Sequence, residues 1–242
     1  MIQKFLGRLR YFTKGEKLLW CSSVAVILVS FFLFRQDGYL SLAASLIGVT
    51  ALLFNAKGHP FGQVLMIIFA LVYGYISWTF SYYGEMITYL GMSAPMAAFA
   101  LVSWLRHPFQ GKRSEVQVNC MQKREVGFML VLTVAVTIAF YFLLQFLNTA
   151  NLIPSTISVT TSFLAVYLTF RRSPYFAFAY AANDLVLIVL WSMAARTNVS
   201  YVSVIICFVA FLANDIYGFV NWLGMRKRQQ LMLHIATEST GE

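Results

Sequence analysis

Charge and cysteine are both scarce in this chain. Asp, Glu, Lys and Arg make up 11% of its 242 residues, 60% are hydrophobic, and the mean hydropathy of +0.70 exceeds that of soluble domains of ordinary composition. The three cysteines are isolated, without CxxC or Cys/His spacing, and the three histidines fall in predicted loops or the tail. We therefore expect free structural thiols, no metal site and no cofactor.

Motifs of enzymes and of nucleic-acid binding are also missing. The sequence has no HExxH, GxSxG or GxGxxG pattern and no membrane carboxylate pair with an attendant histidine. The net charge of +9 comes from short basic clusters between hydrophobic runs, without the interleaved aromatic residues of RNA-binding segments. We predict that the chain is not an enzyme and that nucleic acid is not a partner.

Long hydrophobic runs dominate the sequence instead. A run of about 18 residues or more crosses the ~30 Å hydrocarbon core as a helix. Such segments are predicted at residues 17–34, 40–57, 60–81, 85–105, 126–148, 152–170, 174–195 and 200–223. We expect an all-α polytopic membrane protein with eight transmembrane helices. The first segment lacks a small-residue cleavage site after Trp20, so we expect a retained helix and not a signal peptide.

Positive charge divides unequally between alternate loops. One side of the membrane would hold 16 of the 18 Lys and Arg residues, and the other side only Arg35 and Arg196. The positive-inside rule then places both termini of this multi-pass membrane protein in the cytoplasm. The long basic loop, residues 106–125, fits this rule. The alternative is a loop that docks a cytoplasmic partner.

Residues 40–105 and 149–223 share marks that predict two three-helix repeats. Each has a basic residue before a proline in a tight turn (Lys57 to Pro60, Arg172 to Pro174), and each has a Trp closing its second and its third helix (Trp78 and Trp191, Trp104 and Trp222). Residues 106–148 would supply the basic loop and one linker helix, so the repeats would be parallel, with the substrate site near the midplane between them. Residues 1–39 would add a cytoplasmic segment and an extra helix, and residues 224–242 a cytoplasmic tail.

The triplet Ala-Asn-Asp occurs twice within apolar runs. Asp184 falls near the middle of its segment, where a carboxylate facing lipid costs roughly 2.5 to 3.5 kcal/mol, so we expect it to face the bundle. Asn183, Tyr180 and Trp191 share much of its helical face. The alternative is an inter-helix hydrogen bond that only fixes packing. Asp215 lies nearer the cytoplasmic end, and we expect it to reach interfacial water or a loop base.

Further polar residues are candidates for substrate contact. Asn214, Tyr217 and Asn221 form a polar stripe along one helix face, which suits a pathway lining, whereas Trp222 at the boundary is expected to be an interfacial anchor. The remaining candidates are Gln63, Thr88 and Tyr89, with Glu85 at the mouth of their segment and a possible kink at Pro95. Hydroxyls are also frequent from Ser155 to Ser162, although hydroxyls often bond their own helix.

Four stretches carry a resemblance to a known family: SLIGVTALLFNAKGHPFGQVLMIIFALVYGYISW, YYGEMITYLGMSAPM, YAANDLVLIVLW and ANDIYGFVNW. From about Ser41 to Arg228 the chain resembles the PnuC family of nicotinamide riboside transporters. That resemblance implies a SWEET-like core of parallel three-helix repeats behind the extra first helix, and a homotrimer in the lipid bilayer. It also implies uptake of nicotinamide riboside by facilitated diffusion, with a cytoplasmic kinase trapping the product.

Alternatives remain open within and outside this class. Related family members are assigned to thiamine or riboflavin. Asp184 could couple transport to protons, which would make the protein a symporter. The rival class is a membrane-embedded enzyme or sensor that uses the basic loop to dock a partner.

Overall fold

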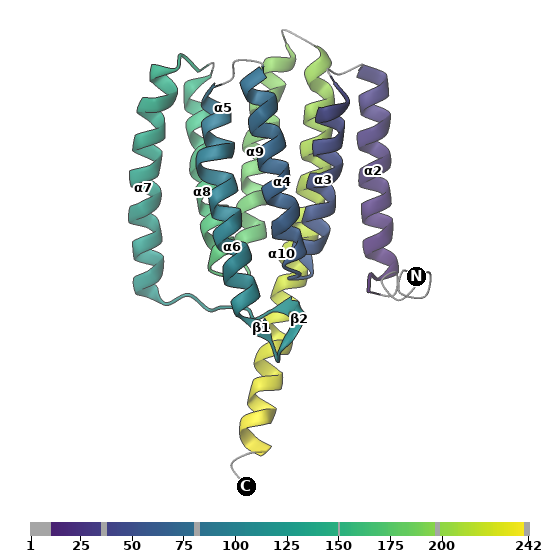
Figure 1. Cartoon of the computed structure of the whole chain (residues 1–242), viewed down its shortest axis with the longest axis vertical. Coiled ribbons are helices and arrows are strands. Elements are labelled where there is room, and N and C mark those ends of the chain that lie inside the picture. The colour runs from purple at the N-terminus through teal and green to yellow at the C-terminus, as the bar shows by residue number, and fades with distance from the viewer. Residues whose placement is uncertain (1–10, 35–37, 80–82, 150, 197–198, 240–242) are drawn as a thin grey trace.

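The computed structural model describes residues 11–34, 38–79, 83–149, 151–196 and 199–239 (Figure 1). Its α-helices are α2 (Lys14–Phe34), α3 (Tyr39–Ala56), α4 (Phe61–Thr79), α5 (Tyr83–Ile87), α6 (Ala94–Arg106), α7 (Lys123–Phe146), α8 (Leu152–Phe170), α9 (Phe176–Ala195) and α10 (Val202–Ser239). A π-helical turn, Thr88–Ser93, joins α5 to α6, and a 3-10 turn, Val199–Tyr201, precedes α10. Two short antiparallel strands, β1 (Pro108–Phe109) and β2 (Lys112–Val116), form a hairpin.

The helices stand side by side as one bundle, with α2 and α7 at its outer edges in Figure 1. In the ranges that the structure describes, eight spans, counting α5 to α6 as one, are long and apolar enough to cross a membrane. This confirms the predicted all-α polytopic class, and the predicted boundaries lie within three residues of the observed ones except at the end of the last helix. The hairpin and the last part of α10 project from one end of the bundle, called here the hairpin end, and the other is called the opposite end.

Contacts between helices follow the two predicted three-helix groups. In the first group α4 packs against α3 and α6, and in the second α9 packs against α8 and α10. Between the groups, α6 packs against α8 and α10 packs against α3. The third helix of each group therefore contacts the first helix of the other. That the two groups are parallel repeats stays a prediction.

The turns after α3 and α8 share one backbone conformation. Gly58 and Arg172 are both left-handed, with φ of 66° and 56°. Their amides donate to the carbonyls of Asn55 and Thr169, at 2.9 and 3.0 Å. A left-handed residue after a helix satisfies carbonyls that would otherwise lack a partner. The two turns thus end their helices in the same way, at the hairpin end.

The span from Tyr83 to Arg106 changes its winding before Pro95. Proline has no N–H, and its ring excludes the carbonyl four residues earlier, so the α-helical ladder is interrupted there. The structure places the π-helical turn at this point, where the sequence predicts a possible kink. Such turns are frequent at functional sites. Here Thr88, Tyr89 and Ser93 of the turn line the internal cavity.

The predicted basic loop and tail differ most from expectation. Residues 106–125 contain the hairpin, and α10 continues to Ser239 instead of ending near residue 223. The side-chain amide of Gln229 donates to the Glu115 carboxylate (2.8 Å) and to the Val116 carbonyl (3.0 Å), and its oxygen accepts the Val118 N–H (2.8 Å). Because packing against the hairpin orders this polar part of α10, hydropathy gives no signal for it.

Helix α2 is tied to the bundle through a buried carboxylate. Its start is a capping box, in which Glu16 N donates to Thr13 Oγ1 (3.2 Å) and Thr13 N to Glu16 Oε2 (2.7 Å). Glu16 is 2% exposed, lies 3.1 Å from the Lys57 ammonium and accepts the Tyr217 hydroxyl at 2.7 Å. A buried carboxylate is tolerated when it is paired and hydrogen-bonded. This one joins α2 to α10 and to the turn after α3.

Candidate functional site

A cavity of about 780 Å³ lies inside the bundle, between the two helix groups. Its walls come from α3, α4, the span from α5 to α6, the end of α7, and α8 to α10. Tyr83, Asn151 and Arg196 line it near the opposite end and are exposed, so the cavity reaches the surface there. Its volume is within the range of about 300 to 1,000 Å³ of small-molecule sites.

An asparagine surrounded by hydroxyls forms one wall of the cavity. Asn183 of α9 is buried, and its Oδ1 accepts hydrogen bonds from Ser158 (3.2 Å), Thr161 (2.8 Å) and Ser162 (3.1 Å) of α8. These three donors occupy the amide oxygen and hold the side chain in one orientation. Among the described residues no acceptor reaches its amide nitrogen. The NH₂ group of Asn183 is therefore free to donate to a ligand.

Carboxyl groups make the interior of the cavity acidic. Asp184 of α9 and Asp215 of α10 line it, are each 4% exposed and lie within hydrogen-bonding reach of one another. Glu85 is a third acidic lining residue. On the described part of the wall the one basic side chain is Arg196, at the exposed end. A cleft lined by one sign of charge concentrates ions of the other sign, so this cavity favours cations.

The location of Asp215 corrects the sequence prediction. A contact with interfacial water or a loop base is predicted, but the carboxyl group is buried beside Asp184. Position along an apolar segment does not show which neighbour covers a residue, and here α10 packs against α9, which brings Asp215 beside Asp184.

Aromatic rings supply a further part of the wall. The ring of Tyr73 lies between those of Phe69 and Tyr89, with centroids 4.8 and 5.2 Å away. Nearer the open end, the rings of Trp191 and Tyr201 are 5.2 Å apart. All five residues line the cavity. Their faces suit a flat aromatic ligand, and a positive charge on that ligand would strengthen the contact.

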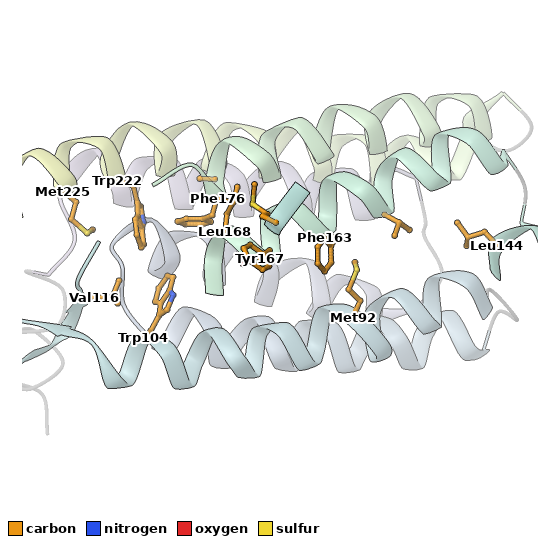
Figure 2. Packing of buried hydrophobic residues seen from close by; sticks show 13 residues of the cluster. Met92, Trp104, Val116, Leu144, Phe163, Tyr167, Leu168, Phe176, Trp222 and Met225 are labelled. Carbon is orange, nitrogen blue, oxygen red and sulfur yellow. The ribbon is translucent and has the colours of Figure 1, made fainter. Parts of the chain in front are cut away.

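Large rings close the bundle between the cavity and the hairpin end. Trp104 of α6 and Trp222 of α10 are fully buried and project toward each other, with centroids 5.5 Å apart, and Phe176 lies 4.8 Å from Trp222 (Figure 2). The indole of Trp104 donates to the Thr169 carbonyl (2.9 Å), and that of Trp222 to the Asn55 carbonyl (2.8 Å). Each indole therefore bonds the first helix of the other group. The predicted interfacial anchor at Trp222 is wrong, because its ring packs inside the protein.

Six of the ten predicted substrate-binding residues line this one cavity. They are Thr88, Tyr89, Tyr180, Asn183, Asp184 and Trp191. They come from both helix groups, and the site therefore lies between the groups, where a repeat-built carrier is expected to hold its substrate.

The other four predicted residues do not line the cavity. Gln63 donates to the Asn55 side chain (2.8 Å), and Asn221 to the Ala56 carbonyl (2.7 Å). Asn214 donates to Ser23 (2.9 Å), and Tyr217 to Glu16, so both face α2. The stripe along α10 thus joins helices and does not form the predicted pathway lining. Helical spacing places residues on one face without saying which neighbour covers it.

Sequence reasoning missed two parts of the site. The first is Asp215 as a partner of Asp184. The second is the set of hydroxyls around Asn183, although the run from Ser155 to Ser162 is a visible signal for it. Positions 158, 161 and 162 share one face at helical spacing. What the sequence could not supply is that α8 turns this face toward α9.

Within the described residues, eight helices apolar enough to span a membrane surround a cavity with polar and acidic side chains, as in a multi-pass membrane transporter. The family model for the nicotinamide mononucleotide transporter matches residues 38–224, and the chain belongs to this family. Similar curated proteins are the nicotinamide riboside transporter PnuC of Neisseria mucosa, 26% identical over 202 residues (81% of this chain, 76% of that protein), and that of Haemophilus influenzae, 21% identical over 216 residues (89% and 92%).

A solved structure has the same fold. The crystal structure of the vitamin B3 transporter PnuC superposes with a TM-score of 0.77 at 24% identity, and covers 90% of this chain and 94% of its own. The fold class and the resemblance to the PnuC family, both predicted from the sequence, are confirmed. The relatives are transporters, in agreement with the expectation that this protein is not an enzyme.

Proposed function

We propose that this protein carries nicotinamide riboside across the membrane. Both curated relatives are named for that substrate. Nicotinamide riboside is a pyridinium cation with a carboxamide and a ribose, and it needs an acidic wall, aromatic faces and hydrogen-bonding partners. The observation that carries the proposal is that the free NH₂ of Asn183 and the carboxyl groups of Asp184 and Asp215 line one cavity.

The substrate contacts are proposed to come from both helix groups. The amide of Asn183 would donate to the carboxamide or a ribose hydroxyl, and the rings of Tyr89 and Trp191 would pack against the flat part of the ligand. Thr88, Tyr180 and Asp184 complete the set of predicted contacts on the cavity wall.

The hairpin end and both termini are proposed to face the cytoplasm of a bacterium, in its inner membrane. In support, every basic residue that the structure describes, except Arg196, lies at the hairpin end or beyond it. The cavity is then open to the outside, and Trp104 and Trp222 close the path inward. Rocking of the two helix groups about the cavity would part these rings and release the substrate inward.

Transport is proposed to be facilitated diffusion, with a cytoplasmic nicotinamide riboside kinase removing the free substrate. A phosphate adds negative charge to the product, which an acidic cavity disfavours, so return through the carrier is blocked. The protein is further proposed to be a homotrimer in the lipid bilayer. Helix α7 exposes large apolar side chains, among them Phe128, Val131 and Phe142, which can pack against lipid or a neighbouring copy.

Uptake of labelled nicotinamide riboside into proteoliposomes tests the function. The wild-type protein should give saturable uptake, and Asn183→Ala should weaken binding about ten- to a hundredfold, which corresponds to one or two hydrogen bonds of about 1.5 kcal/mol. Asn221→Ala is the matched control, because it removes one asparagine hydrogen bond outside the cavity. Saturable thiamine uptake without nicotinamide riboside uptake would overturn the substrate assignment.

Thiamine is the second candidate, because it is also cationic and the acidic wall suits it equally. The same vesicles separate facilitated diffusion from proton-coupled symport through Asp184. With no kinase inside and the same buffered pH on both sides, facilitated uptake should continue until the two concentrations are equal and should survive a protonophore. A collapse of uptake under the protonophore would favour symport.

A further inference from the structure

Asp184 and Asp215 stand at the same depth in the bundle. Asp184 lies eight residues after Phe176 on α9, Asp215 lies seven before Trp222 on α10, and the rings of Phe176 and Trp222 are 4.8 Å apart. At 1.5 Å per residue, both carboxyl groups are about 11 to 12 Å above that ring contact. The two Asn-Asp sequences, on different helices, thus bring their carboxyl groups together. We call them the carboxyl pair.

No cationic side chain of the described residues neutralises the carboxyl pair. Neither member has a salt bridge within the described ranges, and no protein donor among them reaches Oδ2 of Asp184. The neighbouring titratable groups are the hydroxyls of Tyr180 and Tyr89 and the thiol of Cys207. Glu85 is a further carboxyl group on the same cavity wall. Each neighbour is therefore neutral or acidic.

The contact within the pair has a consequence for its charge. A carboxylate accepts hydrogen bonds but has no hydrogen to donate, so a bond between two carboxyl groups requires a proton on one of them. With that proton the pair has one negative charge, and without it two. The second charge is stable only if a cation replaces the proton, because like charges in contact repel strongly.

We propose that the carboxyl pair holds one proton when the cavity is empty and releases it when the positively charged substrate binds. The O–H bond breaks, the proton passes to water through the open end, and the substrate cation takes its place beside two carboxylates. A proton is taken up again when the cation leaves. One proton therefore returns outward for each cation that enters, so at equal pH on both sides the substrate still moves down its own gradient until its two concentrations are equal. This assigns Asp215 a role in specificity, and it rests on the proposed function only in taking the substrate to be a cationic vitamin.

Selectivity for charge follows from this exchange. A neutral ligand of the same shape cannot replace the proton, and it gains only the contacts that do not depend on charge. Reduced nicotinamide riboside is such a ligand, since its dihydropyridine ring has no positive charge. The pair therefore favours the oxidised over the reduced form of the same nucleoside, and favours it more strongly as the pH rises.

Calorimetric binding of nicotinamide riboside to the purified protein, in buffers of different ionisation enthalpy, counts the released protons. We expect the release of close to one proton per bound cation. Over the pH range in which the empty pair is protonated, the affinity should rise about tenfold per pH unit. Reduced nicotinamide riboside should release none. Asp215→Asn should abolish the release and reduce the preference for the oxidised form, whereas Glu115→Gln, which removes a carboxylate outside the cavity, should retain both. Binding of the cation with no proton release in the wild-type protein would overturn the proposal.

Infrared spectroscopy tests the proton without any assumption about the substrate. The ligand-free protein should show a protonated-carboxyl band that is absent from the double variant Asp184→Asn/Asp215→Asn and that a bound cation removes. A missing band refutes the exchange whatever the protein transports. If nicotinamide riboside does not bind but thiamine binds and removes the band, the proposed substrate is wrong and the exchange stands. If neither cation alters the band, the exchange is wrong.

Discussion

The two ends of the bundle are built from opposite kinds of interaction. At the hairpin end, the rings of Trp104, Trp222 and Phe176 fill the space between the helix groups, and each indole bonds a backbone carbonyl of the other group. Toward the opposite end, a cavity lies between the same groups, and its lining includes hydroxyl, amide, carboxyl and aromatic side chains. Indole hydrogen bonds join the two groups at one end, and a cavity separates parts of them at the other.

This difference explains how the cavity can be open at one end of the bundle while the other end stays closed. The hydroxyl of Thr88 on the cavity wall bonds the Gly84 carbonyl of its own helix at 2.9 Å, so this hydroxyl needs no partner across the cavity. The indole bonds of the closed end cross from one group to the other and would be lost if the groups separated. Opening the hairpin end therefore breaks both indole hydrogen bonds.

Removal of a tryptophan from the closed end should have the largest effect. Trp222→Ala leaves a large void and removes the indole hydrogen bond to the Asn55 carbonyl, at about 3 to 5 kcal/mol for a buried Trp. We expect the cavity to become accessible from the hairpin end. The measurement is labelling of Ala97→Cys, on the cavity wall, by a membrane-impermeant maleimide in inside-out vesicles, with the three native cysteines replaced.

Trp78→Ala is the control for this change, because its indole is exposed on α4. Labelling should stay low in that variant. If Trp222→Ala does not fold, Trp222→Phe retains a ring and loses only the bond to Asn55, at about 1 to 3 kcal/mol. A folded variant with unchanged labelling would mean that the tryptophans do not close the path.

The sequence predicts the helices well, whereas the full composition of the site depends on how the helices pack. Apolar runs bounded by charge predict all eight spans, because the membrane imposes a length and a polarity on each. The cavity position of Asn183 and Asp184 follows from the cost of facing lipid. No such rule applies to Asp215 or Asn214, since their surroundings depend on which face of α10 meets α9 and which meets α2. A single sequence does not show how α10 is rotated about its axis relative to these two neighbours.

A second prediction concerns the buried ion pair that fixes α2 at the closed end. Glu16→Ala leaves the Lys57 ammonium without its carboxylate and the Tyr217 hydroxyl without its acceptor. Breaking a fully buried pair costs about 3 to 5 kcal/mol, and because Lys57 remains partly exposed, we expect about 2 to 3 kcal/mol. Thermal unfolding followed by tryptophan fluorescence measures the loss.

Arg228→Ala is the matched control, because it breaks a more exposed pair, with Glu115, at the same end and leaves Glu115 as the acceptor of Gln229. Exposed pairs contribute about 0 to 1 kcal/mol, so its midpoint should shift much less. Equal shifts in the two variants would show that burial of the Glu16 pair adds nothing to the closed end.

The smallest effect should come from the two matching turns. Gly58 adopts its left-handed backbone freely, whereas Arg172 holds the same conformation with a side chain, at roughly 1 to 2 kcal/mol. Burial and the neighbouring Arg171 also lower the pKa of the Arg172 guanidinium, and two of its nitrogens are buried without a hydrogen-bond partner in the described structure. We expect Arg172→Gly to stabilise the protein by about 1 kcal/mol in the same unfolding assay, provided that its carbonyl still accepts the Asn119 N–H.

Gly58→Ala should act in the opposite direction, since it adds the left-handed strain and brings a Cβ to 3.2 Å from Met225. Opposite signs would show that the two turns perform the same task with different residues. A loss of stability in Arg172→Gly would instead mean that the guanidinium stabilises the closed end by more than the backbone strain costs. The uptake assay then tests the role of the Arg172 guanidinium. If uptake by Arg172→Gly falls together with its stability, Arg172 helps to hold the hairpin end closed.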